Sequence, residues 1–336
     1  MNHSDNQTNI IPKILCIALI IVVGLLCISS AQGSIGELLN AGGTHAAPTL
    51  PINIPTVRPT PSYTSPNGQS ASAGETPAPS PTATARPVLG QLTHNGAAEE
   101  IAHHTDSELE FIITRVTREK LVYYTVELAL TSPYQLLTAF AGNRITNRDY
   151  TSNIAQSNDA LLAINGDFCG YNSNGIIIRN GILYRDTAST RSLAVYDSSG
   201  NFSYIPEKDA DAQALIDAGV FHTFSFGPVL VENSQATSDE VIEEHFLSHR
   251  VREPRTAIGQ LGPLHYLILV VDGRQDASQG MLFSELQDTF VSYGVISAYN
   301  LDGGGSSTLY YNGEVINSPC VEGERKVSDI IFFKGA

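Results

Sequence analysis

The sequence is short of positive charge. Its 336 residues include 19 Lys and Arg against 34 Asp and Glu, a formal net charge of −15. A surface of this sign repels nucleic acid and anionic lipid headgroups, so we expect neither as a ligand. Any site for an anionic substrate must therefore be a local cluster of a few cations.

Large apolar residues are almost missing between residues 40 and 90, where the chain reads "PTVRPTPSYTSPNGQSASAGETPAPSPTATARP". Such a segment cannot bury enough apolar surface to offset the entropy lost on ordering it. We therefore predict a Pro/Ser/Thr/Ala-rich disordered linker over residues 36–95, leaving residues 96–336 as one globular domain.

Charge is also missing from residues 14–28, "ILCIALIIVVGLLCI", which follow Lys13 and precede the small residues "SSAQG". This length lies between that of a signal-peptide core and that of a membrane span. We predict that residues 1–35 hold a cytoplasmic start and a signal-anchor, giving a single-pass protein of the cell membrane whose C-terminal domain is extracytoplasmic. If the segment is instead a cleaved signal peptide, the domain is secreted.

Cysteine is scarce, and two of the four cysteines, Cys16 and Cys27, lie in the apolar run. Outside the reducing cytoplasm the remaining pair, Cys169 and Cys320, could form a disulfide. Because the sequence does not place their Cα atoms, the paired and the free states both stay open.

The domain reads as strands and hairpins with a few helices. β-Branched and aromatic runs predict strands within residues 109–140, 160–164, 264–271, 295–300 and 327–333. We predict a polar helix at 146–158, a short helix near 212 that ends at a glycine, and, from apolar residues at helical spacing, a helix at 281–293. Asn180-Gly181 and Asn312-Gly313 predict hairpin turns. The strand, helix, strand order over 264–301 favours a parallel pair with a crossover helix. We expect an α+β fold with a mixed, largely antiparallel sheet core.

Three predicted strands end in polar, glycine-containing turns: "AINGDF", "LVVDGR" and "YNLDGGGSST". Each turn carries an aspartate, Asp167, Asp272 or Asp302. If these turns meet at one sheet edge, their carboxylates could serve as acid, base or nucleophile. Aspartate and glycine are also common turn residues, which is the alternative explanation for any single turn.

Gly303, Gly304 and Gly305 are consecutive, and Ser306 and Ser307 follow them. Backbone N–H groups without Cβ atoms nearby can form a concave anion site, although a tight turn between strands explains the same letters. The lysine of a phosphate-binding nucleotide loop is missing, as is the spaced glycine pattern of dinucleotide sites. Arg255, Arg274 and Arg325 lie at or near turns flanking strands, where they could bind phosphate or form surface ion pairs.

Seven strings resemble the phosphodiester glycosidase family in order and spacing: "INGDF", "RTAIG", "LVVDGR", "GMLFSEL", "AYNLDGGGSSTL", "NGEVINSP" and "ERKVSDIIFF". The resemblance implies a hydrolase that cleaves a sugar-1-phosphodiester in envelope or exopolysaccharide glycans. The implied catalytic candidates are Asp167, Asp272, Glu285 and Asp302. The substrate- and phosphate-binding candidates are Asn165, Arg255, Arg274, Gly303, Gly304, Gly305, Ser306, Ser307 and Arg325.

The first string departs from the family pattern, because Asp167 and Cys169 stand where a second glycine and paired aromatics are common. Asp272 and Asp302 are therefore the better-supported acids. The sequence requires no cofactor, although Asp272 and Asp302 could bind Ca²⁺ or Mg²⁺; no EF-hand spacing is present, and the metal is unknown. No protein partner is indicated. The alternative function is a non-catalytic glycan-binding module on a cell-surface stalk, which would not need paired carboxylates.

Overall fold

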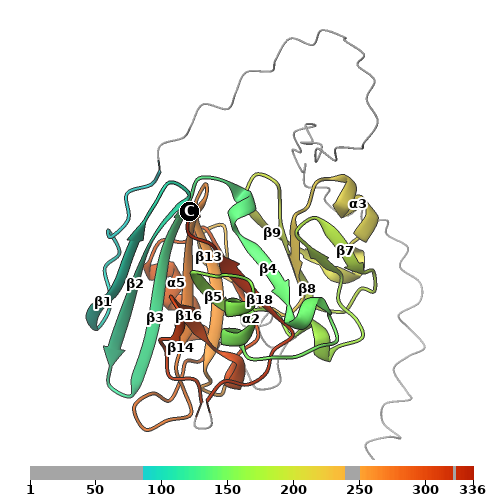
Figure 1. The fold of residues 1–336 in the computed structure, drawn as a ribbon. Helices are drawn as coiled ribbons and strands as arrows, with labels where there is room; N and C mark the ends of the chain where they lie inside the picture. The colour runs from blue at the N-terminus through green and yellow to red at the C-terminus, as the bar shows by residue number, and fades with distance from the viewer. Residues whose placement is uncertain (1–85, 239–249, 321–322) are drawn as a thin grey trace, which may run out of the picture. The chain divides into compact units, whose positions relative to one another are not determined.

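The computed structural model describes residues 86–238, 250–320 and 323–336 (Figure 1). The apolar run at residues 14–28 lies outside these ranges, as does the linker up to residue 85. Within the described ranges, no helix is long and apolar enough to cross a membrane.

A large antiparallel sheet carries one side of the domain. Its strand order is β1(Ala97–Thr105), β2(Leu109–Arg118), β3(Leu121–Leu130), β14(His265–Val271), β13(Arg255–Gly262), β15(Ser297–Asn300), β11(Val229–Glu232) and β12(Gln235–Ala236). Successive side chains of the strands between β1 and β12 point to opposite faces, so each face of the sheet has its own core. α5(Phe283–Ser292) covers one face, packing Phe290 near Leu267 and Leu269.

A second antiparallel sheet packs on the other face. It has the order β17(Glu314–Val315), β16(Leu309–Tyr311), β5(Leu162–Asn165), β18(Asp329–Phe333) and β4(Leu137–Phe140). Phe111 and Ile268 of the large sheet share a core with Ile164 and Ile331 of the second, which gives a layered sheet-on-sheet arrangement. α2(Thr151–Ser157) lies against β5 and β18.

Smaller elements complete the domain. The sheet of β10(His222–Phe224), β8(Ser192–Tyr196) and β9(Phe202–Pro206), the hairpin of β6(Ile177–Arg179) and β7(Ile182–Arg185), and α3(Ala212–Asp217) lie on the right in Figure 1, away from β1–β3. Single 3-10 turns occur at Pro133–Gln135, Ala141–Asn143, Cys169–Tyr171, Glu207–Asp209 and Gly304–Ser306.

The structure confirms the α+β class and corrects one detail of topology. β14 and β15 run in the same direction but are not neighbours, because β13 pairs antiparallel with both. β13 therefore lies between the two strands of the strand, helix, strand unit. The prediction that these two strands pair directly in parallel is wrong. The order of elements along the chain does not indicate this insertion, because β13, "RTAIGQLG", precedes the whole unit.

Both predicted Asn-Gly turns are confirmed. Asn180 and Gly181 have φ of 52° and 75°, and Asn312 and Gly313 have φ of 48° and 96°. Two positive φ values in a row define the hairpin turn that Asn-Gly favours. Residues 86–95, which the sequence assigns to the linker, here contact the large sheet: the Gly90 amide donates to a Glu127 carboxylate oxygen at 2.8 Å.

Strand direction brings distant turns to one edge. Because β13 runs opposite to β14 and β15, its first residue, Arg255, lies at the edge where those two strands end. The end of β5 meets the start of β18 in the same way, with Asn165 paired to Ile330. The Asp302 amide donates to the Gly166 carbonyl at 3.2 Å and so joins the two sheets at this edge.

Candidate active site

The first two residues of the glycine loop, residues 303–305, lie close to other protein atoms. A Cβ on Gly303 would lie 2.8 Å from the Pro254 carbonyl oxygen. Gly304 has φ +60°, and a Cβ there would lie 3.2 Å from Nη2 of Arg274. Close approach therefore favours glycine at 303 and the backbone conformation favours it at 304, where the nearest neighbour is an arginine of the chain itself.

Arg325 lies against the same loop and is held by three groups. It donates to both Asp302 carboxylate oxygens at 3.2 and 3.1 Å, to the Ser306 hydroxyl oxygen at 2.7 Å and to the Gly303 carbonyl at 3.1 Å. Burial raises the pKa of Asp302, while the Ser306 hydrogen bond and the Arg325 charge oppose that rise. Asp302 and Ser306 thus position a guanidinium beside Gly305.

Arg274 provides a second cation next to the first. Its Nε donates to Glu253 at 2.5 Å, a hydrogen bond that raises its pKa. The Arg274 side chain is 50% exposed and that of Arg325 is 44% exposed. Each guanidinium keeps N–H groups toward solvent, so the two can bind a shared oxyanion beside the glycine loop.

Asp272 is tied to this loop through Asn317. The Asn317 amide donates to Asp272 Oδ1 at 3.0 Å and to the Ser307 carbonyl at 3.1 Å, and the Ser318 amide adds a 3.0 Å bond to Asp272. Burial raises the pKa of Asp272 to about 6 despite these donors. A carboxyl with this pKa can exchange a proton near neutral pH.

Asn165 is buried and forms hydrogen bonds to residues on both sides of the glycine loop. Its side-chain amide donates to the Asp302 carbonyl at 2.6 Å, and its Oδ1 accepts from the Thr256 hydroxyl at 2.8 Å and the Thr308 amide at 3.2 Å. Ser307 is 1% exposed, so its hydroxyl does not line an open surface. Asn165 and the two serines therefore shape the loop from inside the protein.

The Arg255 guanidinium is held by partners outside the glycine loop. It donates to the carbonyls of Met281 and Val251, both at 3.2 Å, and its guanidinium lies 3.8 Å from the centre of the Phe283 ring. Burial lowers its pKa to about 10. The structure therefore places Arg255 as a brace between two loops that border the site.

Asp167 belongs to a separate buried cluster. Its Oδ1 lies 3.0 Å from Arg179 and accepts from the Cys169 amide, and its Oδ2 accepts from the Ser225 amide at 2.8 Å. Arg179 also contacts Asp329 at 2.9 Å. Asp167 is fully buried, so in this conformation it stabilises the turn and does not line an open cleft.

Arg179 itself is a central residue that the sequence reading missed. Burial would lower its pKa, but the fields of Asp167 and Asp329 raise it above the ordinary value. Burial and the neighbouring Asp167 raise the pKa of Asp329 to about 6. A lone arginine in the apolar "IIIRNG" was the available signal, since a buried charge needs a partner.

The ligand atoms of Asp167, Cys169 and Asp329 lie within 4.8 Å of one another. They do not fit a metal ion, because Arg179 already bridges the two carboxylates and burial raises the pKa of Cys169 well above its usual value. Cys169 and Cys320 are both free thiols, which decides the open question of their pairing in this structure.

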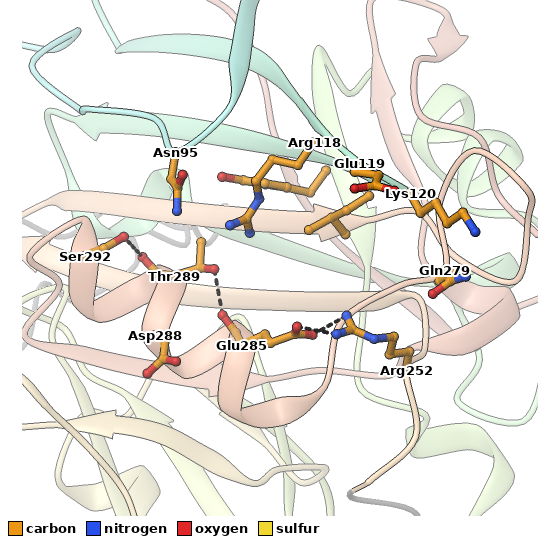
Figure 2. A pocket seen from close by; sticks show the side chains of 12 residues that line it. Asn95, Arg118, Glu119, Lys120, Arg252, Gln279, Glu285, Asp288, Thr289 and Ser292 are labelled. Atoms are coloured by element: carbon orange, nitrogen blue, oxygen red, sulfur yellow. Dashed lines mark hydrogen bonds and ion pairs between the residues drawn. The ribbon is translucent and has the colours of Figure 1, made fainter.

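Glu285 lies apart from the glycine loop contacts. It accepts from the Leu282 amide at the start of α5 and forms a two-pronged ion pair with Arg252, both distances 2.5 Å. It lines a pocket of about 630 Å³ between α5 and the turn joining β2 to β3 (Figure 2).

The family model described as phosphodiester glycosidase matches residues 158–334, which include every candidate residue from Asn165 to Arg325. The chain belongs to the phosphodiester glycosidase family. The matched residues include four of the five strands of the second sheet, all except β4, together with the glycine loop and both exposed arginines.

Two curated relatives show the range of similarity. The SPbeta prophage-derived protein YomE of Bacillus subtilis is 30% identical over 237 residues, 66% of this chain and 36% of the relative. The N-acetylglucosamine-1-phosphodiester alpha-N-acetylglucosaminidase of Bos taurus is 32% identical over 105 residues, 30% of this chain and 20% of the enzyme. The matches thus span only about a third or less of these relatives.

Two solved structures share the fold. The catalytic domain of the zebrafish N-acetylglucosamine-1-phosphodiester alpha-N-acetylglucosaminidase has a TM-score of 0.56 at 22% identity, covering 71% of this chain and 88% of that one. A Synechocystis hypothetical protein has a TM-score of 0.51 at 14% identity, covering 67% of this chain and 62% of that one.

Proposed function

We propose that this protein is a hydrolase that cleaves the bond between a sugar and phosphate in a sugar-1-phosphodiester. One observation carries the proposal: two half-exposed arginines, Arg274 and Arg325, lie against adjacent glycines of one loop to which Asp272 is also tied. The membership of the chain in the phosphodiester glycosidase family supports the same reaction.

Arg274 and Arg325 would bind the non-bridging oxygens of the phosphodiester. Guanidinium groups match such oxygens geometrically, and they supply the positive charge that the rest of this acidic protein lacks. Their charge also stabilises the phosphate as it departs, so little protonation of the leaving group is needed. Asp302 and Ser306 act through Arg325 by fixing its position.

Asp272 would be the general base. A water molecule attacks the anomeric carbon and gives its proton to the Asp272 carboxylate. The bond from that carbon to the phosphate oxygen breaks, and its electron pair leaves with the phosphate as a phosphomonoester. The free sugar is the second product.

The curated relatives make N-acetylglucosamine the first sugar to test, because two of them carry N-acetylglucosamine-1-phosphodiester in their names. The uncharged run at residues 14–28 and the long linker after it support export and tethering at the cell membrane. From that location we propose envelope or exopolysaccharide glycans as the natural substrates.

The test is incubation of the full-length protein with a panel of sugar-1-phosphodiesters, with released reducing sugar as the readout. Arg274→Ala should abolish turnover while the protein stays folded by circular dichroism. Lys208→Ala, which removes an exposed cation from the Glu207–Asp209 turn, is the matched control and should keep full activity. Undiminished turnover by Arg274→Ala contradicts the proposal.

A non-catalytic glycan-binding module is the second candidate. It has no need for an acid held beside the cationic loop, so the Asn317 link between Asp272 and Ser307 favours the enzyme. Binding of the diesters without any release of reducing sugar would reverse that preference.

A further inference from the structure

None of the residues assigned to the proposed reaction lines the pocket that contains Glu285. It lies between the β2–β3 turn, which brings Arg118 and Lys120, and the outer side of α5, which brings Asp288 and Ser292 (Figure 2). Its volume of about 630 Å³ is large enough for a small organic ligand.

The pocket is at the same edge of the large sheet as the candidate active site. β3 pairs antiparallel with β14, and Tyr123 stands opposite Val271, so the start of β3 lies where β14 ends. The Asp272 amide donates to the Val122 carbonyl at 3.0 Å. This bond links the residue after β14, the proposed general base, to the first residues of β3, whose preceding turn lines the pocket.

Two loops form walls of both sites. Arg252 pairs with Glu285 in the pocket, while its neighbour Glu253 holds Arg274 beside the glycine loop. Gln279 lines the pocket, and its backbone N–H donates to the Lys120 carbonyl at 2.8 Å; the same loop carries Arg274. These two loops therefore connect the pocket to the glycine loop site through residues adjacent in the chain.

The chemistry of the lining favours a neutral, hydroxyl-rich ligand. Arg252 and Glu285 neutralise each other, which leaves two cations, Arg118 and Lys120, balanced by two acids, Glu119 and Asp288. The Nε of Arg118 is buried without a hydrogen-bond partner in the described part of the chain. The cations donate hydrogen bonds and the carboxylates accept them, which suits sugar hydroxyls because a hydroxyl does both. A second phosphate would be repelled by the two carboxylates.

We infer that this pocket binds a neutral sugar or polyol unit of the substrate on the far side of the phosphodiester from the cleaved bond. The inference rests on the proposed function, since it extends that substrate. It assigns the pocket a role in selecting substrates by what is attached beyond the phosphate.

The test compares two diesters of the same sugar 1-phosphate, one to methanol and one to a hexose hydroxyl. Ser292→Trp should fill the pocket from the exposed end of α5. We expect it to raise KM for the hexose diester about tenfold or more, equal to about 1.4 kcal/mol of lost binding. The kcat values and the KM for the methyl diester should stay unchanged. Val291→Trp, on the same helix but outside the pocket lining, is the control and should change neither substrate.

Equal effects of Ser292→Trp on the two diesters, or none on either, would overturn the inference. Titration calorimetry with the hexose diester separates this from failure of the proposed reaction. If the wild-type protein releases no sugar yet binds this diester, and Ser292→Trp weakens the binding while Val291→Trp does not, the pocket assignment holds and the reaction is refuted. A wild-type protein that does not bind the hexose diester refutes the pocket.

Discussion

Two arginine–aspartate groups stand at neighbouring strand ends, and they differ in access. The Arg179 side chain is 2% exposed and lies between Asp167 and Asp329, whereas the Arg325 side chain is 44% exposed and pairs with Asp302. The first guanidinium is enclosed by protein partners; the second still faces solvent. Aspartates in similar glycine-containing turns therefore take structural or functional roles according to what covers them.

The largest effect should come from breaking the buried group. Arg179→Met removes the cation and leaves two carboxylates enclosed without it, so we expect a loss of about 3–5 kcal/mol in the free energy of unfolding. Chemical denaturation of the full-length protein measures it. Arg274→Met is the control, because its half-exposed ion pair should contribute less than about 1 kcal/mol. Equal losses of unfolding free energy in Arg179→Met and Arg274→Met would show that the buried and the exposed arginine do not differ in their contribution to stability.

The next effect is catalytic. Asp272→Asn removes the proposed base and should lower kcat by about 10²–10⁴-fold. The same substitution should increase the stability of the folded protein at neutral pH. A raised folded pKa means that stability is fully present below the unfolded value of about 3.9 and is lost as pH rises through about 6.

At pH 7, therefore, Asp272→Asn should have a higher Tm than wild type, while below pH 4 the two should melt together. Asp276→Asn, an exposed change in the same loop, should alter neither kcat nor Tm. An inactive variant with a lowered Tm would indicate a structural role for Asp272 like that of Asp167.

The pH profile sharpens the same assignment. If Asp272 acts as base, kcat/KM should rise about tenfold per pH unit below its pKa of about 6 and level off above it. Steady-state rates between pH 4 and pH 8 measure this. A profile that falls through this range would make Asp272 an acid.

The sequence was most informative where local chemistry determines structure. Asn180-Gly181 and Asn312-Gly313 specify their hairpin turns, and the long apolar run after Leu264 specifies β14. β1 was missed because its residues are mostly polar and exposed, as expected for an edge strand. The intervening β13 could not be placed, since pairing order depends on contacts between distant segments.

For the site, the sequence singled out the glycine loop and Arg274 and Arg325, which the structure brings together. It could not tell that Arg255 stacks on Phe283 or that Asp167 is enclosed with Arg179. Burial depends on the whole fold, so the same residue types at the end of a strand can be buried in one place and exposed in another. The roles of these residues in turnover stay predictions.

The smallest expected effect tests the contact between the loop and its cation. Gly304→Ala adds a Cβ 3.2 Å from Nη2 of Arg274, at φ +60°. The left-handed backbone should cost about 1 kcal/mol of stability, and the displaced guanidinium should raise KM a few-fold. Gly313→Ala is the matched control, because Gly313 has φ +96° but no atom within 4 Å of the added Cβ. It should lose similar stability with no change in KM.

Combining Gly304→Ala with Arg274→Lys decides whether the KM effect passes through the arginine. A lysine at this position lacks the planar group that the new Cβ would displace, so adding Gly304→Ala to Arg274→Lys should raise KM no further. Additive increases in KM would mean that the glycine acts on the substrate independently of Arg274. In that case the backbone of the glycine loop, and not Arg274, would bind the anion. Arg325 would then be the one exposed arginine left to compare with the buried Arg179.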